Sequence, residues 1–462
     1  MSRYDVVVIG GGVGGCTAGA LLSKLGKSVV VLEKDSQVSG RCIDIPYKGY
    51  TLNLGGHLIV DPGSGITKVF DYLGKKLEFG PINDTLSLYH EGEWVPINEM
   101  YAGIKDEIRG VIKEIVSSDF SEFDRYENVP LRYWVRERTD SEEILALYEI
   151  LAGLEFQTSE WYDHSASEFL YMRKMHYQEK RMAAFSFWPK AGLLGLVKIL
   201  VDSIEENGGE VRTDSKATEL IVKDNKVRGV RVQKSPKLTP NEYPETEVIE
   251  ADNVICTIPI WNVLDIVSED LLPPWFVAKI KYLAQDQFRD SWYGFYAGLD
   301  KPIYGLSEHE IASWTKDGTR TGQSGYLYLQ SAFDRSMAPE GKHLMICGSY
   351  VRDPLLMKDR QWLERKFEEL DLDMEERFPD LKEHCLWKSR HLIWDCGIFS
   401  KPGLVGSIRP DNRVPNVEGL YLGGDTARGI SVGMDRAART ALTCTELILG
   451  ERLPEFKDSP HL

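Results

Sequence analysis

Glycines with a fixed spacing near the N terminus are the first residues whose types and positions suggest a chemical role. An apolar run ends at three glycines in the pattern G-x-G-x-x-G, namely Gly10, Gly12 and Gly15. A buried strand, a tight turn and a helix are expected, and the N terminus of such a helix offers unpaired N–H groups to a pyrophosphate. Glu33 closes the next apolar run, where a carboxylate can accept hydrogen bonds from a ribose. The pattern predicts a dinucleotide-binding site but does not select the dinucleotide.

A second segment with an acid among glycines lies towards the C terminus. The short apolar run 420–422 leads into Gly424 and Asp425, and a helix is expected to begin near Gly433. An acid at a strand end beside a helix N terminus suits hydrogen bonds to a polyol or a pyrophosphate. The positive end of the helix dipole, at Gly433 and Met434, suits an electron-rich group such as the pyrimidine end of a reduced flavin.

The elements that must position these residues are spread along the chain. Residues 208–232 predict three short strands with a tight turn at 224–225, and residues 249–259 predict a further buried strand. A helix with apolar residues at helical spacing precedes them and stops at two glycines, 208–209. Within the remaining chain, residues 131–156 predict two amphipathic helices and residues 291–303 a strand with bulky side chains on both faces.

The expected fold class is α/β, with a discontinuous Rossmann-type dinucleotide-binding domain and an inserted α+β substrate domain that carries a helical cap. The insertions are too long for structureless loops in a compact protein, so they are assigned to the second domain. The boundaries that we expect are residues 1–60, 189–259 and 405–450 for the first domain, 61–188 and 260–404 for the second, and 451–462 for a C-terminal tail.

The composition narrows the function classes. With a net charge of −16 over 462 residues, nucleic acid is not expected as a partner. The seven cysteines are scattered without C-x-x-C or metal-ligand spacing, which indicates reduced thiols of a cytoplasmic protein and no metal site. No apolar run reaches about 18 residues, so no transmembrane segment is expected, and no signal peptide precedes the first strand. Peripheral contact with a membrane stays open.

Taken together, these segments resemble the flavin-dependent amine oxidase superfamily, and within it the phytoene desaturase-like branch. "QVSGR" keeps the final Gly40-Arg41 of the family's R-x-G-G-R motif, and "GYTLNLGGHLI" is similar to the segment that passes the flavin ring. Asn53 stands where the family often has Asp, and Ala191 replaces a glycine in "FWPKAGLLGL". "EADNVICTIP" and "GLYLGGD" are close to the family's form.

The resemblance implies FAD as the cofactor, bound in extended form by the first domain. The residues that it implies along the pyrophosphate are Gly10, Gly12, Val13, Gly14 and Gly15. Glu33 and Lys34 are implied beside the adenosine ribose, and Gly40 and Arg41 beside a phosphate, which Arg41 neutralises. The backbone of Ala217 is implied at the adenine. The residues implied at the ribityl and flavin half are Gly424, Asp425, Gly433 and Met434.

Two further residues are implied near the flavin ring. If the segment around Gly56 and His57 matches the family, both lie at the edge of the flavin, and His57 is the predicted catalytic residue. An imidazole there could polarise a substrate, move a proton or bond the cofactor, while the alternative is a structural histidine.

Cys396 lies upstream of Asp425 at a spacing like that of the cysteine that tethers flavin in some relatives. Its surroundings, "WDCGIF", are not their pattern, so a free thiol is expected.

The function that the resemblance implies is that of an FAD-dependent oxidoreductase. Amine oxidases of this superfamily often have a lysine near the flavin, but Lys279 and Lys281 fall in a helical stretch. We therefore expect hydride transfer at a CH–CH bond of an apolar small molecule, carotenoid- or isoprenoid-like, by desaturation or saturation. Aromatic residues near the expected pocket agree with this, namely Trp161, Trp188, Trp261 and Trp292. A flavin-dependent amine oxidase and a non-redox flavin-dependent isomerase or mutase remain alternatives, and the electron donor or acceptor stays open.

Overall fold

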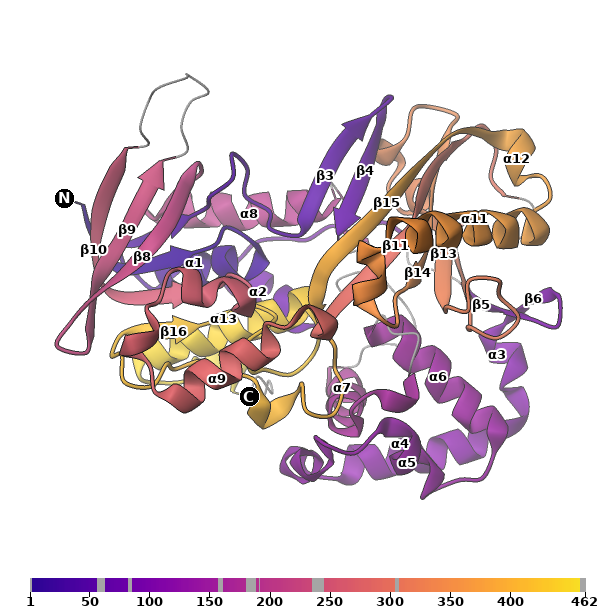
Figure 1. Ribbon diagram of the computed structural model, residues 1–462, viewed down its shortest axis with the longest axis horizontal. Coiled ribbons are helices and arrows are strands. Elements are labelled where there is room, and N and C mark those ends of the chain that lie inside the picture. Colours follow the sequence, from indigo (N-terminus) through magenta and orange to yellow (C-terminus); the bar gives the residue numbers. More distant parts are fainter. Residues whose placement is uncertain are drawn as a thin grey trace.

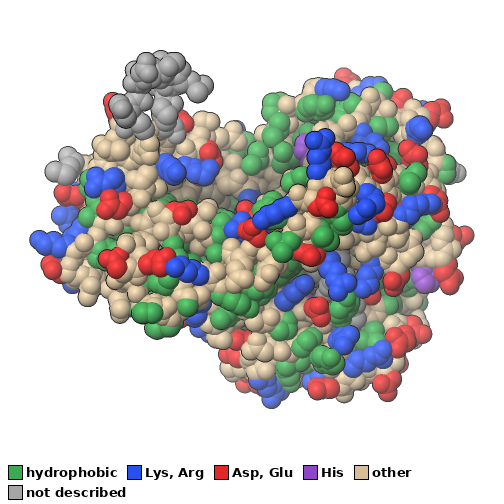
Figure 2. Space-filling view, in the orientation of Figure 1, with side chains coloured by type: hydrophobic (Ala, Val, Ile, Leu, Met, Phe, Trp, Pro, Cys, Tyr) green, Lys and Arg blue, Asp and Glu red, His purple; other side chains and the backbone are tan. Residues whose placement is uncertain are grey.

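The computed structural model describes residues 2–55, 63–81, 85–156, 161–179, 188–190, 192–234, 245–303 and 307–457. Figure 1 shows one sheet with its helices on the left, a second sheet on the upper right, and a group of helices below the second sheet. Acidic and basic side chains are interspersed over the visible face, and a notch along its upper edge separates the two sheet regions (Figure 2).

The first sheet has seven strands and is mostly parallel. Its order is β7-β2-β1-β10-β9-β8, with β16 also paired to β10. The pairs β10–β9 and β9–β8 are antiparallel, and the other pairs are parallel. The strands are β1 (Arg3–Ile9), β2 (Val29–Leu32), β7 (Glu210–Arg212), β8 (Ser215–Lys223), β9 (Lys226–Lys234), β10 (Thr246–Cys256) and β16 (Leu420–Leu422). The strands predicted at 208–232, 249–259 and 420–422 are thereby confirmed, as is the turn at 224–225, where both residues have positive φ.

Continuous apolar runs form the central strands because both faces of this sheet are covered. Val6 and Val8 pack into a core with helices on one face, and Val7 and Ile9 into a core on the other face. The helices of the first face are α1 (Val13–Lys24), α2 (Gly65–Leu73), α8 (Gly192–Glu206) and α13 (Gly433–Leu449). The opposite core includes α9 (Pro274–Leu283). This doubly covered, mostly parallel sheet confirms the expected α/β class with a Rossmann-type domain.

The second sheet also has seven strands, in the order β15-β11-β14-β13-β12-β5-β6. All neighbours are antiparallel except β12 and β5. The strands are β5 (Thr85–His90), β6 (Glu93–Pro96), β11 (Arg289–Leu299), β12 (Glu310–Trp314), β13 (Gly325–Leu329), β14 (His343–Tyr350) and β15 (Cys385–Ile398). As expected, β11 is buried along most of its length, with Trp292 and Tyr293 on opposite faces.

Helices cover this sheet and extend below it. The lower group is α3 (Ile97–Met100), α4 (Lys105–Ser117), α5 (Leu131–Arg136), α6 (Glu142–Phe156) and α7 (Ala166–Gln178). Its core contains Trp134 and Phe169, and the two helices predicted over 131–156 are confirmed as α5 and α6. The remaining helices are α10 (Gln330–Phe333), α11 (Arg360–Arg377) and α12 (Leu381–His384).

Two further features bear on the site. A separate hairpin, β3 (Cys42–Tyr47) with β4 (Tyr50–Gly55), leaves the first sheet region towards the second. Each large sheet takes its strands from the segments expected for its domain, while the boundaries of that division stay a prediction. In the described part of the chain, no helix is long and apolar enough to cross a membrane. All seven cysteines have free thiols.

Candidate dinucleotide-binding site

The first glycine turn is a close-packed junction between β1 and α1. Gly10 has a φ of +107°, and a Cβ added there would lie 2.8 Å from Thr257 Oγ1. A Cβ on Gly15 would clash with the carbonyl oxygen of Gly10. The Thr257 hydroxyl donates to the carbonyl oxygens of Ile9 and Gly10, at 2.9 and 3.2 Å. Glycine is therefore required at both positions by the path of the backbone.

The N terminus of α1 is open and lies against two other glycine segments. Gly12 is its N-cap residue, no side chain caps it, and its first turn contains no acidic residue. Val13 begins the helix and is buried. Cβ atoms placed on Gly12 and Gly14 would lie 3.6 Å from Gly40 Cα and 3.4 Å from Gly424 Cα, respectively. Three glycine segments thus meet at one helix N terminus, whose N–H groups and dipole favour an anion.

Glu33 lies directly after β2 and is only 6% exposed. Its carboxylate accepts hydrogen bonds from the backbone N–H groups of Gly11, at 2.8 Å, and Asp35, at 3.0 Å. A carboxylate has about four lone-pair sites, so two of them remain for ribose hydroxyls. Glu33 therefore also holds the first glycine turn against the end of β2, a structural role that the sequence did not reveal.

Lys34 and Ala217 border this region in different ways. The Lys34 side chain is 62% exposed and forms an ion pair with Asp35 at 2.6 Å. Ala217 is buried in β8, two residues after Ser215, whose N–H donates to the carbonyl oxygen of Glu33 at 2.8 Å. The backbone thus brings Ala217 near Glu33, whereas Lys34 is turned to solvent. Their contacts with a nucleotide stay predictions.

An ion pair joins the other two glycine segments. We call the segment around Gly40 the second glycine segment and the segment around Gly424 the third. Arg41 Nη2 donates to Asp425 Oδ1, and Arg41 Nη1 donates to the carbonyl oxygen of Cys396. Asp425 is 8% exposed, while the Arg41 side chain keeps 37% of its surface. Burial alone would lower the pKa of Arg41, but the Asp425 carboxylate outweighs it and raises that pKa. The guanidinium is therefore a fixed cation with open surface for an anionic group.

The predicted helix α13 begins at Gly433, and its N terminus lies beside the same group of segments. Its N-cap residue makes no side-chain hydrogen bond, which leaves the first N–H groups open. Met434 Sδ lies 3.6 Å from the Sγ of Cys42, the residue after Arg41. Further along the helix, the Thr440 hydroxyl donates to the Gly424 carbonyl at 3.0 Å. These contacts hold α13 against both the second and the third glycine segment.

Gly56 and His57 lie outside the described residues. Gly55, the last described residue before them, has a φ of +111°, and a Cβ there would clash with the Arg41 carbonyl oxygen. The end of β4 is thus packed against Arg41. The assignments of Gly56 and His57 stay predictions.

Cys396 lies beside Arg41, and the two lysines of α9 lie at the surface with partners of their own. Burial raises the pKa of the Cys396 thiol and Asp290 raises it further, while Arg41 lowers it. A thiol that resists ionisation is a poor nucleophile. Lys279 Nζ donates to the Ser407 carbonyl at 3.0 Å, and Lys281 pairs with Glu269 at 2.7 Å, both at the surface.

Two residues that hold the site together were not singled out from the sequence. Thr257 follows β10 directly, and its place at a strand end was an available signal. Arg409 is 1% exposed in a loop and donates to the carbonyl oxygens of Asp425, Leu404 and Ile398, at 2.9, 3.0 and 3.2 Å. Burial lowers the pKa of Arg409. A loop arginine carries no sequence pattern that announces such a role.

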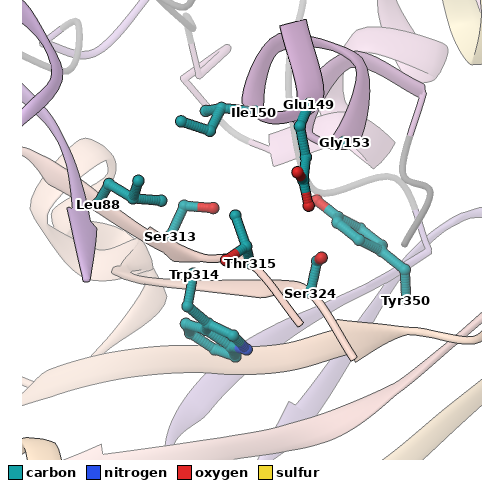
Figure 3. Close-up of a pocket in the computed structure, with 9 residues that line it drawn as sticks. All are labelled: Leu88, Glu149, Ile150, Gly153, Ser313, Trp314, Thr315, Ser324 and Tyr350. Atoms are coloured by element: carbon teal, nitrogen blue, oxygen red, sulfur yellow. The ribbon is translucent and has the colours of Figure 1, made fainter. Parts of the chain in front are cut away.

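A separate small cavity lies between α6 and the second sheet. Figure 3 shows Glu149 and Ile150 reaching towards it from the helix side, and Ser313, Thr315 and Ser324 from the strand side. Its other lining residues are Leu88, Gly153, Trp314 and Tyr350. None of the predicted cofactor residues lines this cavity. In the described chain, no group of three or more His, Cys, Asp or Glu residues is arranged to hold a metal ion.

Comparisons with known proteins agree with this arrangement. Residues 8–73 match the profile of the NAD(P)-binding Rossmann-like domain. A 4,4'-diapophytoene desaturase from Methylomonas sp is 24% identical over 99% of this chain and 97% of its own length. The crystal structure of an oxidoreductase from Methanosarcina mazei superposes with a TM-score of 0.75, at 20% identity, over 96% of this chain and all of that chain. A putrescine oxidase bound to putrescine gives a TM-score of 0.68 at 16% identity, over 97% of this chain and 99% of that one.

The fold and these matches define the class of the chain: it is an α/β protein with a Rossmann-like domain of the NAD(P)-binding type, and its homologues are desaturases. More narrowly, it is a homologue of the phytoene and diapophytoene desaturases and has structural neighbours in the flavin amine oxidase superfamily.

Proposed function

We propose that this chain is an FAD-dependent oxidoreductase that transfers a hydride between an apolar organic substrate, at a CH–CH bond, and the flavin. The observation that carries the proposal is the convergence of three glycine segments at the N terminus of α1, closed by the Arg41–Asp425 pair. The full-length similarity to a desaturase favours a CH–CH bond over an amine. An apolar small-molecule partner and a cytoplasmic location are part of the same proposal.

The residues present fit a dinucleotide with a flavin at one end. The close approaches at Gly10 and Gly15 hold α1 tightly against β1, as a turn that binds a pyrophosphate requires. The open N terminus of α1 supplies N–H donors, and Arg41 supplies a cation that keeps part of its surface. Asp425 and the open N terminus of α13 continue the site beyond the pyrophosphate.

We assign a role in FAD binding to residues at both ends of the site. Glu33 accepts hydrogen bonds from ribose hydroxyls while it holds the Gly11 N–H, and the backbone of Ala217 borders the adenine. Asp425 accepts from the ribityl hydroxyls, and Met434 packs beside the flavin half. When bound, FAD supplies the hydride chemistry, with N5 of its flavin as the hydride acceptor or donor.

Desaturation removes a hydride from one carbon and a proton from its neighbour, and saturation adds both. The chain must therefore move a proton, and His57 is the residue proposed for it because an imidazole titrates near neutral pH. A dry pocket favours such a reaction, and the fully buried Trp188 and Trp292 contribute to the apolar core beside β4.

Anaerobic reduction of the flavin by candidate substrates tests the proposal. A polyene or enone-type compound is expected to exchange electrons with the flavin, seen as a change in its visible absorption, whereas mono- and polyamines are not. In His57→Ala, FAD is expected to stay bound while the rate falls by about 100-fold, the usual scale of a lost acid–base group. Rapid bleaching by a primary amine, with a normal rate in His57→Ala, would overturn both the CH–CH assignment and the role of His57.

The two alternative functions, a flavin-dependent amine oxidase and a non-redox flavin-dependent isomerase or mutase, have less support. Lys279 and Lys281, the lysines considered for amine oxidation, are held by surface partners. The likeness to putrescine oxidase at 16% identity concerns the fold alone. A non-redox isomerase would convert its substrate without a net change in the redox state of the flavin, so the same anaerobic experiment separates it from the proposed function.

A further inference from the structure

The ladder between β11 and β15 is interrupted next to the Arg41–Asp425 pair. Asp290 pairs with Gly397, but Trp292 pairs with Ile393, so residues 394–396 bulge opposite a single residue of β11. Asp395 has a φ of +70°, as expected where a strand leaves its regular path. Bulges of this kind re-aim side chains at the edge of a sheet.

Two arginines hold this bulge in place. Arg41 Nη1 donates to the Cys396 carbonyl and, at 3.5 Å, to the Asp395 carbonyl. From the other side, Arg289 Nη1 donates to Asp395 Oδ1 at 2.8 Å. The bulge of the second sheet is therefore fixed relative to the third glycine segment, because the same Arg41 binds Asp425.

The side chain of Asp290 lies on the face of β11 that is turned to this pair. Residues directly opposite in an antiparallel ladder point to the same face, with Cβ atoms about 5 Å apart. A Cβ on Gly397, opposite Asp290, would lie 3.5 Å from Asp425 Oδ2. Gly397 itself has no side chain that could separate Asp290 from Asp425. Asp290 also keeps part of its surface exposed.

The surroundings of Asp290 favour its neutral form. Burial raises its pKa to about 8, while Lys401 and a hydrogen bond with the backbone of Ser291 lower it. No side chain in the described part of the chain forms a hydrogen bond with its carboxyl group. The titratable groups that interact electrostatically with Asp290 are Lys401, Tyr350 and Cys396. At neutral pH the group is then a hydrogen-bond donor rather than an anion.

The geometry points to the Asp290 side chain as a further contact for the bound cofactor, made from the second sheet and facing the Arg41–Asp425 pair. The inference rests on the proposed function, since it names one more group of the same site. A protonated carboxyl can donate to a hydroxyl, carbonyl or ring nitrogen of the ligand, and it does not repel a pyrophosphate as an anion would.

Infrared spectroscopy tests the contact directly. Wild-type apoprotein is expected to show the C=O stretch of a protonated carboxylic acid at pH 7, and this band is expected to shift when FAD is added. The band is expected to be absent in Asp290→Asn and retained in Asp395→Asn, which removes the neighbouring carboxylate of the bulge. An assigned Asp290 band that does not respond to FAD would overturn the inference.

The pH dependence of FAD affinity provides the second measurement. If the protonated group donates to the cofactor, the dissociation constant of wild-type protein is expected to rise about tenfold from pH 7 to pH 9, because one proton is linked to binding. Asp290→Asn is expected to lose this step and to bind FAD within a few-fold of wild type at pH 7. A step that persists in Asp290→Asn would contradict the inference.

Failure of the inference and failure of the proposed function give different results. Wild-type protein that binds no FAD overturns the proposed function, and the inference with it. Wild-type protein that binds FAD tightly, but with neither an infrared shift nor an Asp290-dependent pH step, overturns the inference alone.

Discussion

The Arg41 guanidinium binds the Asp425 carboxylate although the two residues stand 384 positions apart in the chain. This ion pair connects the residue directly before β3 with the loop before α13, and Arg41 also donates to carbonyl oxygens of the β15 bulge. The Arg41 guanidinium thus fixes the segments around Gly40 and Gly424 and one edge of the second sheet. It is the point at which the candidate cofactor site and the expected substrate region meet.

Arg41→Ala is expected to weaken FAD binding about 10- to 100-fold, because a charged hydrogen bond contributes about 1.5–3 kcal/mol. Part of the loss comes from Asp425, which is 8% exposed and would lose its ion-pair partner. FAD titration by fluorescence quenching measures the effect. Arg3→Ala is the matched control, since Arg3 pairs with Asp252 at the exposed surface, and its loss is expected to leave FAD affinity unchanged.

Gly15→Ala is expected to abolish stoichiometric FAD binding, because the new Cβ would clash with the Gly10 carbonyl and displace α1 from β1. The opposite result is expected for Gly110→Ala in α4, where a Cβ meets no atom within 4 Å. That variant should keep FAD and gain about 0.5–1 kcal/mol of unfolding free energy from helix propensity. Denaturant unfolding and flavin content of both variants check this pair. Normal FAD content in Gly15→Ala would show that the first glycine turn is not part of the FAD-binding site.

Glu33→Ala is expected to reduce FAD affinity about 10- to 100-fold, since it removes a charged acceptor of ribose hydroxyls. It also leaves the Gly11 N–H without its acceptor, so the melting temperature of the apoprotein should fall. Glu219→Ala is the control, because Glu219 pairs with Arg231 at the exposed surface and is not among the predicted FAD residues. Equal FAD affinity in Glu33→Ala and wild type would show that Glu33 serves the turn but not the ribose.

The purified protein is expected to be yellow and to release its FAD on denaturation. Release is expected because burial raises the pKa of the Cys396 thiol, which leaves little thiolate to form a tether. Absorption spectra of the supernatant and pellet after acid precipitation distinguish the two cases. Flavin that stays with the polypeptide in wild type but is released from Cys396→Ser would reverse this expectation. A folded, colourless protein that takes up no flavin would contradict the cofactor itself.

The stability of the apoprotein is expected to depend on the protonation of Asp290 between about pH 4 and pH 8. Its folded-state pKa is about 8, above the value of 3.8 for a free carboxyl, so the folded state binds the proton more tightly than the unfolded state. Stability therefore falls as pH rises from about 4 to 8, and it levels off above 8. Asp290→Asn removes this dependence, so its melting temperature should exceed that of wild type increasingly up to pH 8. Parallel melting curves of the two proteins across that range would contradict the shifted pKa.

Local patterns in the sequence determined most of the first sheet region. Continuous β-branched runs predicted β1 and the core of β10, because a strand buried on both faces has no polar alternation. The glycine spacing predicted the turn before α1, and the segment around Gly424 predicted β16 and the start of α13. Such features follow from a few neighbouring residues, so they can be read without knowing the rest of the chain.

Other features depended on contacts between distant segments, which only the tertiary structure decided. Nothing local to Arg409 or Asp290 distinguishes them from surface residues, yet one is 1% exposed among carbonyl oxygens and the other faces the Arg41–Asp425 pair. Likewise, Glu33 was predicted as a ribose ligand, but its hold on the Gly11 N–H became visible only in three dimensions. The energy of a buried charge or hydrogen bond depends on what surrounds it in space, and that surrounding is assembled from segments hundreds of residues apart.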